Sequence, residues 1–249
     1  MKHHSLIDKV YNPKNLVRAS NSMMRRLGDR IGDRELALLH TQLREGNYSP
    51  QPPKIVRVTT KRLGAGAFQI PTEHDRIVQR ALKQVIEPIL EAEFLDFSFG
   101  YRPKRGRRQA FAVIDHYYRL NLRWALSADV ESFFSSIEKS RLLRLLARRI
   151  ADGKVLSLIE QFLGDQPGIP IGSVLSPLLS NVYLHEVDLA LREERVVRYC
   201  DNYVILASTK EELQSKLSQL ENVLQEVGLR LNEEKTKFLY HPSLEEAFL

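Results

Sequence analysis

Apolar positions recur along this chain with two different periods. Residues 73–91 and 210–227 repeat them at the three-to-four-residue spacing of an amphipathic helix. Residues 55–59 instead alternate and are rich in β-branched side chains, which is typical of a strand. The pattern therefore predicts a mixed protein, in which neither helices nor strands form the whole core.

Two pairs of strand-like segments predict β-hairpins. Residues 55–59 and 68–71 flank a glycine-containing loop, and residues 196–199 and 203–207 flank a tight turn at 200–202. One further strand is expected at the apolar run 124–130. Further helices are expected in four segments: 1–49, 107–120, 138–163 and the stretch that begins at Ser176. Since these elements follow no regular βαβ rhythm, the expected fold class is α+β with an antiparallel sheet.

Composition narrows the class of protein. With 249 residues, of which 43% are hydrophobic, the chain can bury a core of its own. Its single cysteine excludes an internal disulfide framework and a cysteine zinc finger. No apolar run approaches the roughly 18 residues of a membrane span, and no apolar segment follows the polar N-terminus. We therefore expect a soluble cytoplasmic protein without a membrane partner.

Basic residues outnumber acidic ones, 37 to 31, and part of the excess is concentrated. One cluster combines five basic side chains within seven residues: Arg102, Lys104, Arg105, Arg107 and Arg108. Such a cluster is either a solvated face or a phosphate-binding surface. A second basic run, 141–149, lies in the same chain and favours a nucleic-acid interface over a merely solvated face.

Two carboxylates occupy positions where an unused charge would be costly. Asp129 ends an apolar strand, and Asp201 lies at the tip of the predicted hairpin 196–207. Carboxylates at the ends of adjacent strands can bind Mg²⁺, and two such ions about 4 Å apart catalyse phosphoryl transfer. The alternatives are a strand-end cap for Asp129 and ordinary turn chemistry for Asp201 and Asn202. Taken singly, neither residue decides between these interpretations.

Six segments, taken together, form a more specific pattern. They are, in chain order, Gln69–Leu82, Phe97–Pro103, Ser127–Ile137, Gly168–Leu184, Arg198–Asn202 and Gly228–Thr236. In this order they resemble the blocks of bacterial reverse transcriptases of the group II intron-like kind. The resemblance covers most of the chain and implies an α+β fold: a right-hand palm with a small antiparallel sheet backed by helices, plus fingers of helices and a β-hairpin.

The resemblance also implies a domain division and a set of partners. Residues 1–105 correspond to a fingers-like region and residues 106–249 to a palm-like region, within one continuous domain. The helical thumb that normally clamps the primer–template is missing after Leu249. The implied partners are an RNA template, a DNA primer and deoxynucleoside triphosphates, with a thumb supplied by a partner protein or by a longer chain. CRISPR-associated and defence-associated branches of the family are both compatible with this pattern.

Residue roles follow from the resemblance position by position. Asp129 and Asp201, with the backbone of Val130, match the ligands of two Mg²⁺ or Mn²⁺ ions. The ring of Phe134 matches the position that excludes a ribose 2′-hydroxyl, although core packing is the alternative for Phe133 and Phe134. Lys235 matches a lysine near the triphosphate, a candidate proton donor to pyrophosphate. Its alternative is a solvated lysine between two glutamates.

Four departures from the family pattern bear on activity. Asn202 replaces the second aspartate of the usual pair, so metal affinity should fall. Ile171, before Gly172 in the nucleotide-binding block, stands where intron-type members carry glutamine, which suggests reduced fidelity. The basic residue expected before Ile70-Pro71 is absent, and the nearest substitutes are Lys61 and Arg62. The fourth departure is the missing thumb.

Two functions from different classes remain after these observations. The leading one is RNA-directed DNA synthesis by two-metal phosphoryl transfer. The alternative is a catalytically degenerate scaffold that keeps the fold and binds nucleic acid or a partner protein. Asn202, Gly66 in place of a basic residue, and the missing thumb favour the scaffold. The enzyme is favoured by Asp129, Phe134, Asp201 and Lys235.

Overall fold

The computed structural model describes residues 2–28, 31–60 and 64–248, which form two compact units. Unit 1 comprises residues 1–92 and 139–179, and unit 2 comprises residues 93–138 and 180–249. Each unit is thus built from two separate stretches of the chain. The division into a fingers-like region up to residue 105 and a palm-like region after it stays a prediction.

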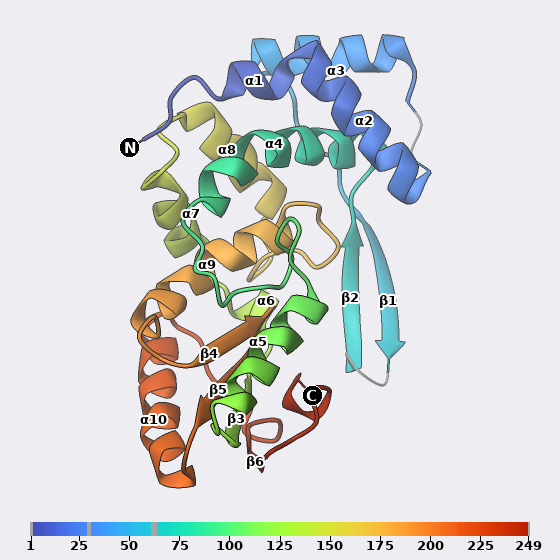
Figure 1. Cartoon of the computed structure of the whole chain (residues 1–249). Helices are drawn as coiled ribbons and strands as arrows, with labels where there is room; N and C mark the ends of the chain where they lie inside the picture. Colours follow the sequence, from blue (N-terminus) through green and yellow to red (C-terminus); the bar gives the residue numbers. More distant parts are fainter. Residues whose placement is uncertain (1, 29–30, 61–63, 249) are drawn as a thin grey trace. The chain divides into compact units, whose positions relative to one another are not determined.

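Unit 1 is mainly helical (Figure 1). Its helices are α1 (Ile7–Tyr11), α2 (Pro13–Leu27), α3 (Asp33–Glu45), α4 (Glu73–Glu91), α7 (Lys139–Ala147) and α8 (Gly153–Leu163). The strands β1 (Lys54–Thr60) and β2 (Gly64–Ile70) pair as an antiparallel hairpin, as expected. The first four helices pack on one another, and α4 contributes a fully buried apolar face that includes Ile77, Leu82 and Ile86.

Local chemistry explains where α4 begins. The hydroxyl of Thr72 accepts a hydrogen bond from the Asp75 amide, which is a typical N-cap. The buried Asp75 carboxylate in turn accepts hydrogen bonds from the hydroxyls of Tyr48 and Thr72 and from the amide of Gln51. This ties the segment before the hairpin to the start of α4.

Unit 2 contains a four-stranded antiparallel sheet in the order β4-β5-β3-β6. Its elements are α5 (Arg107–Arg119), β3 (Trp124–Asp129), α6 (Phe133–Ser136), β4 (Val196–Tyr199), β5 (Asn202–Ala207), α10 (Lys210–Glu226), β6 (Lys237–Tyr240) and the 3-10 helix η1 (Glu246–Phe248). Helix α9 (Ser176–Ala190) begins in unit 1 and continues in unit 2. The α+β expectation with a small antiparallel sheet is confirmed.

Helices cover both faces of this sheet. On one face, Val204 and Phe248 belong to a single apolar cluster with Ile114 of α5, and Ser127 donates a 2.9 Å hydrogen bond to the Ala247 carbonyl. On the other face, the hydroxyl of Tyr203 donates to Asp188 of α9. Successive side chains of a strand point to opposite faces, so β5 contributes to both layers.

One predicted helix proved to be two. The segment 138–163 is divided into α7 and α8, because Asp152 caps a new helix by accepting from the amides of Lys154 and Val155. No helix in the described part of the chain is both long and apolar enough to cross a membrane.

Candidate active site

Asp129 and Asp201 come from neighbouring strand ends of unit 2. Asp129 ends β3 and pairs with Asn202, the first residue of β5. The side-chain nitrogen of Asn202 lies 3.2 Å from Asp129 Oδ2 and 3.5 Å from Asp201 Oδ1. Since both carboxylates approach the same nitrogen atom, they lie close together, as a shared metal site would require.

Asp201 is presented by a two-residue turn. Tyr199 pairs directly with Asn202, so only Cys200 and Asp201 connect β4 to β5. Cys200 has a φ of 59°, and a positive φ at the first turn position suits the right-handed twist of hairpin strands. The turn holds the half-buried Asp201 at the sheet edge, beside the nearly buried Asp129.

Lys235 joins this pair from a distant part of the sequence. Its Nζ lies 3.1 Å from Asp129 Oδ1, and its side chain remains about half exposed. The preceding segment is fixed to the end of β3, because the Asn232 amide donates to the Asp129 carbonyl at 2.8 Å. The geometry favours an ammonium group directed at the site over a lysine that is merely solvated.

The backbone of Val130 faces the same place. Val130 forms an isolated antiparallel bridge with Leu231, and the flanking hydrogen bonds run from Glu131 to Arg230 and from Asn232 to Asp129. In such a bridge, the middle residue's own N–H and C=O point away from its partner. They therefore point toward the β5 side, where Asp201 lies.

The two neighbouring phenylalanines differ in burial. Phe133 is buried in the core, whereas Phe134 is only partly buried, and the two rings meet edge to face. Phe133 therefore packs the core, and Phe134 is the ring that stays accessible for another role.

The Asp129 and Asp201 carboxylates repel each other in the metal-free protein. Burial raises the pKa of Asp201, and the charge of Asp129 raises it further, while its hydrogen bond to Asn202 and the charge of Lys235 act in the opposite direction. Hard divalent cations prefer carboxylate and carbonyl oxygens, so Asp129, Asp201 and the Val130 carbonyl are a suitable donor set. The set is small, and the described residues include no group of three or more histidine, cysteine or acidic side chains that could together hold a metal ion.

This electrostatic arrangement predicts that Asp201 reduces stability. Because its pKa is raised on folding, the folded state holds the proton more tightly, and stability falls as pH rises from about the ordinary value of 3.8 through the folded pKa. We expect Asp201→Asn to raise the free energy of unfolding of the metal-free protein at pH 7, measured by urea titration. The gain should shrink as the pH is lowered toward 4. A less stable variant at pH 7 would contradict this account.

Two nucleotide-binding candidates of unit 1, Ile171 and Gly172, lie against β2. The Ile171 carbonyl accepts a 2.7 Å hydrogen bond from the Gln69 amide, and the Ile171 side chain is exposed. Gly172 has a φ of 106°, and a Cβ there would lie 2.8 Å from the Gln69 carbonyl oxygen, so glycine is required. Lys61 and Arg62 lie outside the described residues.

The basic cluster is not uniform, and the prediction for Arg102 is wrong. Arg102 is buried and donates hydrogen bonds to the carbonyls of Leu95 and Ser98 at 2.5 and 2.8 Å. Its guanidinium therefore closes a loop and cannot contact a phosphate. Arg105 binds the side chain and the carbonyl of Asp96, at 2.5 and 2.6 Å, and is only partly available.

The other three basic side chains of the cluster remain accessible. Lys104 and Arg108 are exposed, and Arg107 lies over the Phe111 ring at 5.0 Å while staying partly exposed. These three are the part of the cluster that a polyanion can reach.

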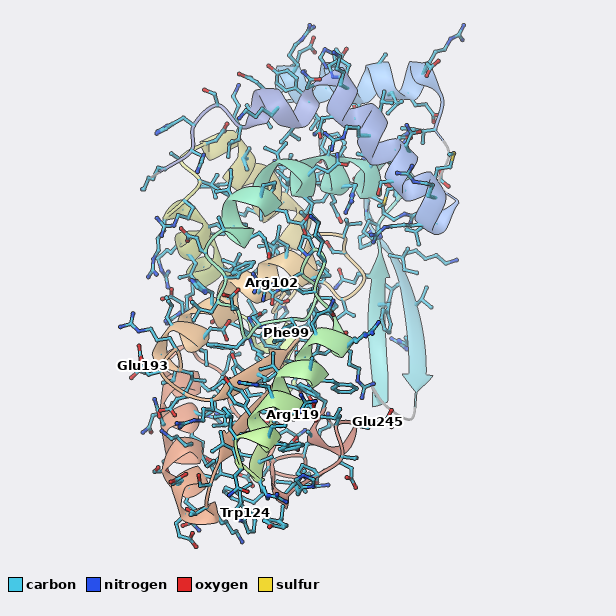
Figure 2. All side chains as sticks on the ribbon, in the orientation of Figure 1. Phe99, Arg102, Arg119, Trp124, Glu193 and Glu245 are labelled. Carbon is cyan, nitrogen blue, oxygen red and sulfur yellow. The ribbon has the colours of Figure 1, made fainter. Side chains whose placement is uncertain are left out.

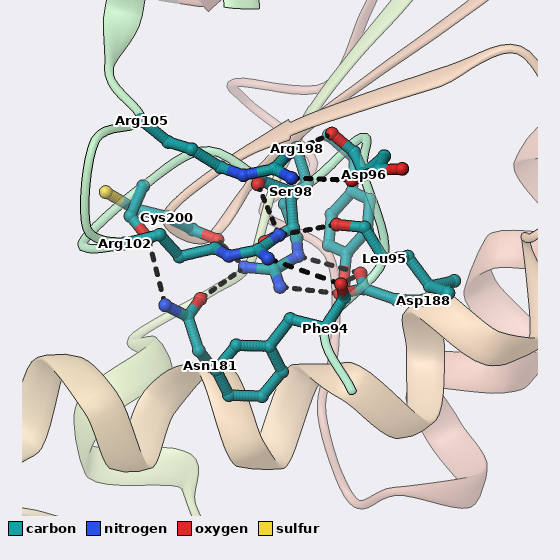
Figure 3. A network of polar contacts seen from close by, with 12 residues as sticks. Phe94, Leu95, Asp96, Ser98, Arg102, Arg105, Asn181, Asp188, Arg198 and Cys200 are labelled. Carbon is teal, nitrogen blue, oxygen red and sulfur yellow. Dashed lines mark hydrogen bonds and ion pairs between the residues drawn. The ribbon is translucent and has the colours of Figure 1, made fainter. Parts of the chain in front are cut away.

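Sequence reasoning missed a buried polar network beneath the turn (Figure 3). Arg198 is fully buried and forms a two-pronged ion pair with Asp188, at 2.7 and 2.6 Å. The third guanidinium nitrogen donates to Asn181 Oδ1 and to the Cys200 carbonyl. A detectable signal existed: Arg198 interrupts an apolar strand, and Asp188 an apolar helix.

The family described as "Reverse transcriptase (RNA-dependent DNA polymerase)" matches residues 66–246. Among curated proteins, the chain is 28% identical to Protein YkfC of Escherichia coli over 86% of this chain and 69% of that protein. It is also 28% identical to the group II intron-encoded protein LtrA of Lactococcus lactis over 85% of this chain and 37% of that protein. The chain thus spans little more than a third of LtrA.

Solved structures give a consistent fold. A chain of a Cas6-RT-Cas1–Cas2 complex matches 89% of this chain and 41% of its own length, with a TM-score of 0.53 and 26% identity. An apo telomerase from Candida tropicalis matches 80% of this chain with a TM-score of 0.57 and 14% identity, which is evidence of the fold alone. The resemblance in fold to a reverse transcriptase palm and fingers is confirmed.

Proposed function

This chain belongs to the reverse transcriptase family, and we propose that it is the RNA-directed DNA polymerase domain of the protein that contains it. The observation that carries the proposal is the convergence of Asp129 and Asp201 on one amide nitrogen, with Lys235 beside them. Members of this family use divalent metal ions, and the oxygen donors of this site suit them.

In the proposed reaction, a primer 3′-hydroxyl attacks the α-phosphorus of a deoxynucleoside triphosphate and pyrophosphate leaves. Two bound Mg²⁺ or Mn²⁺ ions would lower the pKa of the attacking hydroxyl and stabilise charge on the leaving oxygen. Asp129, Asp201 and the Val130 carbonyl would hold these ions. Lys235, whose ammonium lies beside Asp129, donates a proton to the leaving pyrophosphate.

Other residues would select and hold the nucleotide. The accessible ring of Phe134 is proposed to exclude a ribose 2′-hydroxyl, and Ile171 with Gly172 to line the nucleotide and template. Ile171 in place of a polar side chain supports reduced fidelity. Lys61 and Arg62 are proposed to bind the triphosphate.

The proposed partners are an RNA template, a DNA primer and a duplex-gripping thumb. One structural relative is a chain of a complex that includes Cas1 and Cas2, and the curated relatives extend beyond the matched region. We therefore propose that a further domain or a partner protein supplies the thumb. A CRISPR-associated assembly is one setting that fits.

A second function is favoured by one specific observation. Asn202 replaces a carboxylate, which leaves the site with two acidic side chains. A protein with this substitution can retain the fold and bind nucleic acid or a partner protein without turnover. Extension of a DNA primer on an RNA template distinguishes the two functions, assayed with Mg²⁺ and with Mn²⁺ in the natural full-length protein. Extension supports the enzyme, and binding without extension under both conditions supports the scaffold.

Nucleic-acid binding should depend on the accessible part of the basic cluster. Each phosphate neutralised on a duplex contributes about 0.9 to the slope of log affinity against log salt concentration. Replacing Lys104, Arg107 and Arg108 together by glutamine should therefore reduce that slope by about 2 to 3. The slope is measured by fluorescence anisotropy across a salt series.

A matched triple variant controls for net charge. It replaces three basic residues of unit 2 that are exposed and lie elsewhere in sequence: Arg119, Arg192 and Arg195. The control slope should stay near that of the unmodified protein. Equal effects of the two triple variants would assign binding to overall charge and not to this cluster.

A further inference from the structure

The turn that carries Asp201 rests on buried charged groups. Asn181 and Asp188 lie two turns apart on α9, and both bind the guanidinium of Arg198 in β4. The same guanidinium donates at 2.8 Å to the carbonyl of Cys200, the residue directly before Asp201. Arg198 therefore connects a helix to the backbone of the turn.

The loop at residues 97–100 also bonds to Arg198 and Asn181. The Arg198 amide donates to the Phe97 carbonyl at 2.8 Å, and the Phe99 amide donates to the Arg198 carbonyl at 2.9 Å. The Asn181 side-chain nitrogen donates to the Gly100 carbonyl at 2.9 Å, so Asn181 bonds to both the loop and Arg198 (Figure 3). Arg102 closes the same loop from within.

The loop at Gly100 packs tightly against the Cys200–Asp201 turn. A Cβ on Gly100 would lie 2.3 Å from the Cys200 backbone nitrogen and 2.6 Å from its Sγ. Only glycine permits this approach. The turn is therefore limited sterically by Gly100, and its Cys200 carbonyl is held by a hydrogen bond from the Arg198 guanidinium.

Stability alone is a weak reason for this network. A buried ion pair often stabilises a protein no better than apolar residues of similar volume. A fully satisfied polar network does, however, restrict the structure to one arrangement. Cys200 needs such restriction, because a non-glycine residue at positive φ persists only when its surroundings hold it there.

We propose that Asn181, Asp188 and Arg198 are positioning residues that fix the Cys200–Asp201 turn, so that the Asp201 carboxylate stays beside Asp129. The contribution of this network to catalysis rests on the proposed polymerase function. Its effect on the turn does not rest on it, and the two can be tested separately.

Cys200 supplies the first test, because it is the only cysteine in the chain and lies in the turn. Its alkylation by iodoacetamide under native conditions reports on turn opening. Asn181→Ala removes the bonds to Arg198 and Gly100 but leaves the Arg198–Asp188 pair intact. We expect the labelling rate to rise at least about tenfold, because one lost buried hydrogen bond is worth about that factor and this variant loses two.

The matched control is Val187→Ala, a buried truncation on the same helix. It should leave the labelling rate within about twofold of the unmodified protein, although it lowers global stability. Equal labelling in all three proteins would overturn the proposal. So would a rate that rises equally in both variants, because it would then follow global stability.

Primer extension supplies the second test, on the full-length protein. Asn181→Ala should lower kcat at least about tenfold while KM for the nucleotide changes less. Asn181→Asp, which keeps an acceptor for Arg198, should recover part of kcat; if Asn181→Ala does not fold, this variant and Arg198→Lys carry both measurements. Faster labelling with unchanged kcat would refute the catalytic role. If the unmodified protein shows no extension, the polymerase function fails while the labelling result still decides whether the network fixes the turn.

Discussion

Asp201→Ala is expected to abolish primer extension, with a loss of at least about a thousandfold. In the proposed reaction, two bound divalent ions would supply several kcal/mol of charge stabilisation in the transition state, and each 1.36 kcal/mol is a factor of ten in rate. Removing Asp201 leaves Asp129 as the one carboxylate of the pair. The rate is measured as single-nucleotide extension of a labelled primer under saturating nucleotide.

Two comparisons make this result specific. Glu221→Ala removes an exposed carboxylate from α10 of the same unit and should leave the rate unchanged. Asp129→Ala should cost about as much as Asp201→Ala, and the double variant little more, because residues that act as one unit are not additive. Extension that survives Asp201→Ala would refute the role of Asp201 and with it the polymerase mechanism.

The stability of these variants separates function from folding. The raised pKa of Asp201 indicates that this carboxylate is held at a cost, so its loss should not unfold the protein. An inactive variant that is at least as stable as the unmodified protein points to lost chemistry. Stability lost together with activity would point to a structural role.

The pattern of the sequence was sufficient to predict that two acidic side chains lie at neighbouring strand ends, but it did not decide whether Lys235 lies beside them. Asp129 and Asp201 each follow an apolar strand, and strands that pair bring their ends together. Lys235 lies 106 residues from Asp129 in a charged segment, and locally it is indistinguishable from a solvated lysine. The bridge between Val130 and Leu231 and the pairing of β6 with β3, which joins Lys237 to Ser127, bring that segment to the site.

The basic cluster shows a different limit of sequence reasoning. Five positive charges in seven residues look equivalent in sequence, yet Arg102 is buried and Arg108 is exposed. The difference depends on which backbone carbonyls the loop turns inward, and Arg102 meets those of Leu95 and Ser98. Charge density predicts an interface but not which of its members are available to a ligand.

The prediction of a single helix over residues 138–163 was wrong for a related reason. Residues 138–163 are apolar enough at helical spacing to suggest one helix, but the first helix ends at Ala147 and a second begins at Gly153, capped by Asp152. An aspartate is a favoured N-cap, so the signal was present in the sequence. It competes with periodicity, which does not distinguish one long helix from two shorter ones on the same core.

Asn202 is the residue on which the choice between enzyme and scaffold depends. Its amide nitrogen approaches both carboxylates, so it relieves part of their repulsion in the absence of metal. A carboxylate at the same position would instead add charge to the site and a further oxygen ligand for a divalent ion. Asn202 therefore favours the metal-free protein over the metal-bound one.

Asn202→Asp should reverse that preference in two measurements. We expect the metal-free variant to be less stable than the unmodified protein at pH 7, because a third carboxylate joins Asp129 and Asp201. Added Mg²⁺ should stabilise the variant more than it stabilises the unmodified protein, measured as the rise in Tm with Mg²⁺ concentration.

In primer extension, the same variant should be about tenfold faster or more at low Mg²⁺ and should reach half-maximal rate at a lower Mg²⁺ concentration. Asn202→Ser, which adds no charge, is the control and should gain neither rate nor Mg²⁺ affinity. Asp201→Ala combined with Asn202→Asp should be inactive, because the new carboxylate lies on the strand side of the turn and does not replace Asp201 at its tip. If Asn202→Asp binds Mg²⁺ more tightly yet extends no primer, the site holds metal without performing the reaction, and the scaffold function is the correct one.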